Sequence, residues 1–304
     1  MREAVVAAIR SIGVGSSREA AACLLKAETD EDYLIREAAK EAVAHVGPRD
    51  KAIVPFIVAD LKSKIHENGL LWRDAAWQLH PLFQFGADAA EASEIVGQLL
   101  AAQSQTVSNG YVDVQLYALL LAHIGPKAAP QRHYIVESLK WRKNLHARDT
   151  WSLYLALART GCTVEDVPDL QAVLHDALEK HDTKLFVAAS LVAGSLGEGA
   201  RPFVPIIAEA VNQLPDSEYD DRYLGYSSEN PTWDDDHHLS ARILLLEVLG
   251  RLGPTAVSAV PVLTGFQTTS EDFYPSFHSF PHYSVRLHIA VLQTLSKVQP
   301  IPSP

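Results

Sequence analysis

Glycines recur along this chain at the interval expected for a repeating pair of helices. Each follows an apolar stretch with helical periodicity, and the successive separations are 34, 39, 39, 36, 36 and 56 residues. The seven glycines are Gly13, Gly47, Gly86, Gly125, Gly161, Gly197 and Gly253. Glycine readily adopts the left-handed conformation that ends a helix, so each position predicts a helix end. Five separations match one two-helix unit, and the sixth fits a unit with an insertion of about twenty residues.

The stretch from Ser240 to Phe266 shows the unit most clearly. Apolar residues at helical spacing run from Ile243 to Leu252, and Gly253-Pro254 then interrupts the pattern because proline cannot continue a helix. A second apolar segment follows from Val257 to Leu263. In four units a proline follows the glycine by seven or eight residues, where it begins or bends the second helix: Pro55, Pro168, Pro205 and Pro261. Neither helix could bury its apolar face alone, so each unit requires neighbours of the same kind.

These features predict an all-α fold, an α-α superhelix of seven helix pairs with a closing helix over Ser284 to Val298. We expect one repeat domain over residues 1–298, with insertions between repeats at 215–238 and 267–283, and a frayed tail at 299–304. In such a stack, the turns within pairs lie along one edge, and the connections between pairs lie along the other.

The starts of the first helices carry a family resemblance. They contain Arg2-Glu3-Ala4, Arg36-Glu37-Ala38, Arg242 and Arg286. Together with the Gly-Pro turns and the second-helix prolines, this pattern resembles HEAT-repeat proteins over nearly the whole length. The resemblance implies a right-handed α-solenoid that tends to bind partners, and it supplies no catalytic residues. Because the chain begins directly in a repeat-type helix, we expect a partner subunit or a longer chain to cover that helix.

Some families with HEAT-like repeats are enzymes, but their signatures are weak in this sequence. Deoxyhypusine hydroxylases use repeated His-Glu pairs as iron ligands, and this chain has one such pair at His66-Glu67. Nothing identifies the tetrapyrrole site of phycobilin lyases or the basic face of alkylpurine DNA glycosylases. A nucleophile elbow, a phosphate-binding glycine loop and an HExxH motif are also missing from the sequence.

The composition of the chain limits the classes of partner and the cellular location that we expect. The 37 acidic and 26 basic residues give a net charge of −11, which disfavours binding to a phosphate backbone. The basic cluster from Lys140 to Arg148, which includes Trp141, is expected to form a solvated edge. Cys23 and Cys162 lie too far apart in sequence to indicate a disulfide framework or a zinc site. No apolar run reaches membrane-spanning length and the N-terminus lacks a signal core, so we expect a cytoplasmic protein without a membrane span.

Aromatic side chains gather in the connections between pairs, above all in the two insertions, and the first insertion is also rich in aspartate. Because Tyr and Trp suit binding hot spots, we expect a protein or peptide partner of some cationic character here. The candidate residues are Trp72, Trp141, Tyr219, Tyr223, Tyr226, Trp233, Asp234, Asp235, Tyr274, His278 and His282. The same aromatics could instead anchor each loop to its own repeat, and the two interpretations are compatible.

The segment from Asp234 to His238 has the composition of a metal site. His237 and His238 could both reach a cation, with His278 or His282 completing the set of ligands. Aspartates directly before a helix also cap its N-terminus, and we favour this interpretation, so no metal or other cofactor is expected. The sequence thus predicts a non-enzymatic scaffold for protein interactions. The alternative is a metal-dependent or small-molecule enzyme that uses the His and Asp loops.

Overall fold

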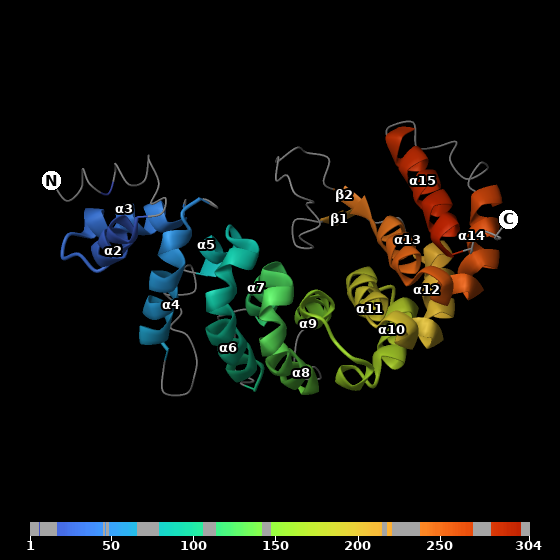
Figure 1. The fold of residues 1–304 in the computed structure, drawn as a ribbon, viewed down its shortest axis with the longest axis horizontal. Helices are drawn as coiled ribbons and strands as arrows, with labels where there is room; N and C mark the ends of the chain where they lie inside the picture. Colours follow the sequence, from blue (N-terminus) through green and yellow to red (C-terminus); the bar gives the residue numbers. More distant parts are fainter. Residues whose placement is uncertain are drawn as a thin grey trace. The chain divides into compact units, whose positions relative to one another are not determined.

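Helices form almost all of the regular structure in the computed structural model (Figure 1). The structure describes residues 6, 17–44, 46, 49–65, 79–105, 114–141, 147–214, 218–220, 238–269 and 281–298. Over these residues the protein is all-α, with helices packed side by side. The one exception in this part of the chain is a pair of three-residue strands. The predicted fold class is therefore confirmed at the level of an all-helical protein.

Contacts divide the chain into two compact units, Met1–Thr160 and Gly161–Pro304. The α-helices of the first unit are α2 (Arg18–Ala27), α3 (Tyr33–Ala44), α4 (Val54–Ser63), α5 (His80–Phe83), α6 (Ser93–Gln105), α7 (Val114–Ile124), α8 (Arg132–Lys140) and α9 (Ala147–Thr160). Its 3₁₀ helices are η1 (Lys51–Ile53), η3 (Gly86–Ala92) and η4 (Gly125–Gln131). The prediction of a single repeat domain over residues 1–298 stays a prediction.

In the first unit, several helices contact a sequence neighbour, and several contact the helix two places along. Thus α2 contacts α3 and α4, α4 contacts α6, α6 contacts α7 and α8, and α7 contacts α9. The apolar faces meet between these helices, where Leu24, Ile57, Leu99, Tyr117 and Tyr154 are fully buried. Asp88 of η3 forms ion pairs with Lys51 of η1 and Lys127 of η4, which links three successive turns.

The second unit comprises η6 (Val164–Asp166), α10 (Leu170–Glu179), α11 (Thr183–Ser195), η7 (Gly197–Phe203), α12 (Val204–Gln213), β1 (Glu218–Asp220), β2 (His238–Ser240), α13 (Ala241–Leu252), η9 (Gly253–Ala259), α14 (Val260–Thr269) and α15 (Pro281–Val298). Here α11 contacts α13, and α13 contacts α15; α12 contacts α10 and α14. The buried Thr294 hydroxyl of α15 donates to the Leu246 carbonyl of α13 at 3.0 Å. α15 begins at Pro281 rather than at the predicted Ser284.

The glycine pattern predicted the helix ends correctly wherever the structure describes them. Gly86, Gly125, Gly161, Gly197 and Gly253 have φ angles of 48°, 68°, 85°, 58° and 53°. Gly13 and Gly47 lie outside the described residues. After four of the five glycines, a seven-residue 3₁₀ segment precedes the second helix, which the sequence did not predict. These segments are short and rich in Ala, Pro and Gly, so they carry no amphipathic stripe that periodicity could detect.

The segment Ala241–Gly265 is long and apolar enough to cross a membrane. It is not one continuous α-helix, because Gly253 and Pro254 separate α13 from α14 through η9. Of its most apolar window, 56% is buried inside the protein. A broken, largely buried segment of this kind is typical of the core helices of packed proteins.

Candidate interaction surface

The connection between α12 and α13 is closed at its base by a short antiparallel ladder. Strand β1 pairs with β2, so that Glu218 faces Ser240, Tyr219 faces Leu239, and Asp220 faces His238. The sequence predicted an irregular connection here, and the ladder was missed because each strand spans only three residues. The ladder brings the two ends of the insertion together beside the start of α13.

An arginine fixes the start of α13 to the end of α12. The Nε and Nη2 atoms of Arg242 both donate to the Leu214 carbonyl, at 3.2 and 3.0 Å. Leu214 is the C-cap of α12, so the guanidinium satisfies a carbonyl that helix geometry leaves without an intrahelical partner. Arg242 is one of the arginines on which the sequence resemblance rests, and its contact gives that position a structural reason.

Most of the predicted partner-binding residues fall outside the described part of the chain. These are Trp72, Tyr223, Tyr226, Trp233, Asp234, Asp235, Tyr274 and His278, and the metal candidate His237 falls there too. Tyr219 and His238 have described backbone positions in β1 and β2, and His282 lies in the first turn of α15. The adjacency expected for the two insertions is therefore not tested.

Trp141 is the one predicted residue whose side-chain exposure the structure describes. It follows α8 directly as its C-cap, and its backbone N–H donates to the Ser138 carbonyl at 3.0 Å. The side chain is 39% exposed at the start of the connection to α9. Its backbone is thus held by the end of the helix, while much of the indole remains open to solvent.

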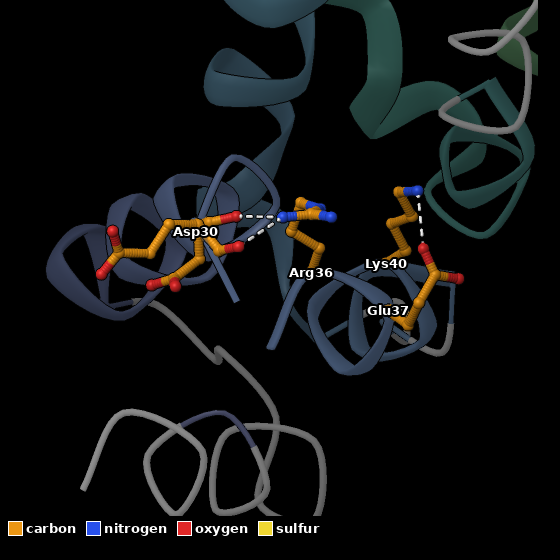
Figure 2. Close-up of polar contacts among 5 residues, drawn as sticks. Asp30, Arg36, Glu37 and Lys40 are labelled. Atoms are coloured by element: carbon orange, nitrogen blue, oxygen red, sulfur yellow. Dashed lines mark hydrogen bonds and ion pairs between the residues drawn. The ribbon is translucent and has the colours of Figure 1, made fainter. Parts of the chain in front are cut away.

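The connection between α2 and α3 is ordered by a network of hydrogen bonds (Figure 2). Asp32 caps α3, because its Oδ1 accepts from the Leu34 N–H at 2.9 Å. The Asp30 Oδ1 accepts in turn from the Asp32 N–H at 3.0 Å. Nη1 of Arg36 reaches back to the Asp30 and Glu31 carbonyls at 2.7 and 2.9 Å. Arg36 thus performs at this connection the same carbonyl bonding that Arg242 performs at the start of α13.

Directly after this connection, the first two residues of α3 are exposed apolar side chains that the sequence analysis missed. Tyr33 is 62% exposed and Leu34 is 65% exposed, the highest values among the large apolar residues with described exposure. The sequence held a signal for this exposure, because Ile35, Ala39 and Ala42 recur at helical spacing. The structure buries these three residues as one stripe of α3. At 100° per residue, Tyr33 and Leu34 fall outside that stripe.

Several charged and polar groups on the turns within pairs have structural roles. Lys51 and Lys127 lower the pKa of the Asp88 carboxyl, with the hydrogen bond from Lys51 as the main cause. Thr163 and Asp166 form a capping box on η6, and the Cys162 thiol lies 3.3 Å from the Ser195 hydroxyl. Among the described residues, no group of three or more His, Cys, Asp or Glu side chains could hold a metal ion.

Trp151 was predicted to be a core residue, and it is buried in α9. His123 was predicted to be an edge or satisfied core histidine. It is an exposed residue in the last turn of α7, with its ring 5.7 Å from that of Phe83. Comparison with known proteins supplies no assignment: no family model matches the sequence, and no curated protein matches it significantly.

Proposed function

We propose that this protein is a non-enzymatic scaffold that binds a protein or peptide along the connections between successive helix pairs. The proposal includes the finer fold of the sequence analysis, a HEAT-like solenoid in which the pairs stack in register. The contacts of α4 with α6, of α7 with α9 and of α11 with α13 support this stacking, because they join equivalent helices of neighbouring pairs.

One observation carries the binding proposal: the exposed aromatic side chains lie at these connections. Seven large apolar residues are exposed among those with described exposure. Trp141 lies between two pairs, and Tyr33, the other aromatic member, lies with Leu34 at the start of α3, directly after the connection from α2. Aromatic side chains bury much area at little entropic cost, which suits them to binding hot spots.

The negative net charge of the chain favours a positively charged partner. A net charge of −11 repels polyanions and attracts partners of cationic character, so electrostatic complementarity favours a basic protein or peptide. The aspartate-rich insertion at 215–238, whose two ends the β1–β2 ladder joins, remains the proposed centre of this surface.

A pull-down with matched variants tests the proposal. One variant replaces Trp141 by Ser, and a second deletes residues 221–232 but keeps both strands of the ladder. A control replaces Val257 by Ser; Val257 is also apolar and is 55% exposed, but lies in η9 within a pair. We expect partners recovered with the wild-type chain and the control to be reduced or lost with the other two. If all four chains recover the same partners in the same amounts, the proposed surface is wrong.

A further inference from the structure

We propose that the α2–α3 connection is itself a docking site for a basic peptide segment that presents one aliphatic or aromatic anchor side chain. The Tyr33–Leu34 patch comprises these two residues with the carboxylates of Asp30, Glu31, Asp32 and Glu37. The inference rests on the proposed function, because the patch lies on the same kind of connection. It adds a location in the first unit and a chemistry for the partner.

The anchor side of the patch is apolar surface that the fold leaves largely exposed. In α3 the residues that pack inward begin at Ile35, whereas Tyr33 and Leu34 keep 62% and 65% of their surface exposed. A single exposed apolar residue is ordinary on a protein surface. Two large neighbours at the first positions of one helix together offer exposed apolar surface onto which a partner side chain can pack.

The patch is also ordered before any partner arrives. Arg36 bonds two carbonyls of the connection, and its guanidinium carbon lies 5.7 Å from the centre of the Tyr33 ring. The Asp32 cap fixes the first turn of the helix that carries both apolar residues. A partner therefore loses less free energy to ordering this surface than it would on a loose loop.

Charge selects a basic partner. Residues 26–41 contain six acidic and three basic side chains. Two of the three cations already have partners: Arg36 bonds the connection's carbonyls, and Lys40 pairs with Glu37 at 2.8 Å (Figure 2). Glu31 and Asp32, both exposed, directly precede the apolar pair in the sequence. Lys or Arg beside an apolar anchor complements this arrangement, whereas a phosphate or an acidic peptide is repelled.

A second copy of the chain fits the patch less well. An isologous contact would bring the same acidic connection of two molecules face to face, and like charges in such a contact cost free energy. The basic peptide avoids this repulsion, so we commit to it as the occupant.

The test uses a phage-displayed library of random 12-residue peptides selected on the full-length protein. Selected phage are depleted on the double variant Tyr33→Ser with Leu34→Ser, so that only peptides needing the patch survive. Surviving peptides are synthesised with a fluorescent label, and their affinities are measured by anisotropy for the wild type, the double variant, Glu31→Gln and the control Val257→Ser. Because Tyr33 and Leu34 are exposed, the double variant should keep the wild-type circular dichroism spectrum and melting temperature.

We expect survivors that combine Lys or Arg with Leu, Ile, Phe, Tyr or Trp. Their affinity should fall at least about tenfold in the double variant, as for hot-spot residues, and should fall a few-fold for Glu31→Gln and on raising NaCl from 50 to 300 mM. Val257→Ser should bind as the wild type does.

Three results would overturn the proposal that this patch docks a basic peptide. Selection could yield no survivor, or survivors that are acidic or wholly polar. Alternatively, light scattering could show a wild-type dimer that the double variant converts to monomers, which would assign the surface to a second copy. If depletion leaves no survivor, and the depleted peptides lose binding to a protein that lacks residues 221–232, the patch is excluded while the proposed function keeps its support.

Discussion

At the scale of single residues, the two carbonyl-bonding arginines connect the sequence pattern to stability. Arg36 and Arg242 both lie near the start of a helix. Arg36 bonds two carbonyls of the connection that enters its helix, and Arg242 bonds the C-cap carbonyl of α12. Arginine suits this role because its fork of donors can make two parallel bonds, which a lysine ammonium cannot arrange with the same geometry. These two arginines thus have a local function in joining consecutive helices.

Replacement of Arg242 by Gln should therefore destabilise the protein by about 1–3 kcal/mol, since both donors to the Leu214 carbonyl are lost. Lysine at this position should restore only part of the loss. The matched control is Arg251→Gln in the same helix, where an exposed pair with Glu247 at 3.9 Å contributes under about 0.5 kcal/mol. Urea unfolding followed by circular dichroism measures all three. Equal losses for the Arg242 and Arg251 variants would contradict the assigned role.

His123 should make stability depend on pH. Although the residue is exposed, the protein around its ring lowers the pKa of the imidazole by desolvation, against the opposing effect of a hydrogen bond to the Phe83 carbonyl; Arg159 lowers it further. The unfolded chain, with an imidazole pKa of about 6.5, binds the proton more readily than the folded one, so stability is lost as pH falls through that value. His123→Gln should therefore lose less of its melting temperature than the wild type between pH 7.5 and pH 5.5. An unchanged pH dependence would show that His123 does not contribute.

At the scale of helices, glycines at the contacts allow two neighbouring helices to approach each other closely. Tyr134 of α8 lies over Gly97 of α6, and its hydroxyl donates to Glu94 of α6 at 3.0 Å. A Cβ at position 97 would overlap the Tyr134 ring. Gly194 brings α11 to α13 in the same way, because a Cβ there would lie 3.1 Å from a Val248 methyl carbon.

Gly97→Ala should consequently destabilise the protein by about 1 kcal/mol, because an overlap cost of about 1–3 kcal/mol exceeds the helix-propensity gain of about 1 kcal/mol. Gly265→Ala is the control, since nothing lies within 4 Å of a Cβ in that α14 position, and it should be neutral or stabilising. In a Tyr134→Ser background the overlap disappears, so Gly97→Ala should then stabilise. Urea midpoints measure the cycle, and destabilisation in both backgrounds would refute the packing account.

At the scale of elements, the sequence predicted most of the helices and few of the contacts between them. Gly125 ends α7, and α8 covers Arg132–Lys140 as the apolar periodicity indicated, because helix ends depend on local chemistry. The η segments and the β1–β2 ladder were missed because they are too short for a periodic signal. Tyr33 and Leu34 were missed because their significance depends on exposure, which is decided by the face that α3 buries.

At the scale of the whole molecule, the stacking of pairs is a proposal with a direct test in solution. A compact globular domain of 304 residues has a radius of gyration of about 19 Å. Seven stacked pairs and a closing helix make eight layers about 9–10 Å apart, which predicts an elongated particle with a radius of gyration of about 25 Å. Small-angle X-ray scattering over a concentration series measures this value and excludes dimers. A monomer near 19 Å would contradict the solenoid, and with it the common edge on which the proposed binding surface depends.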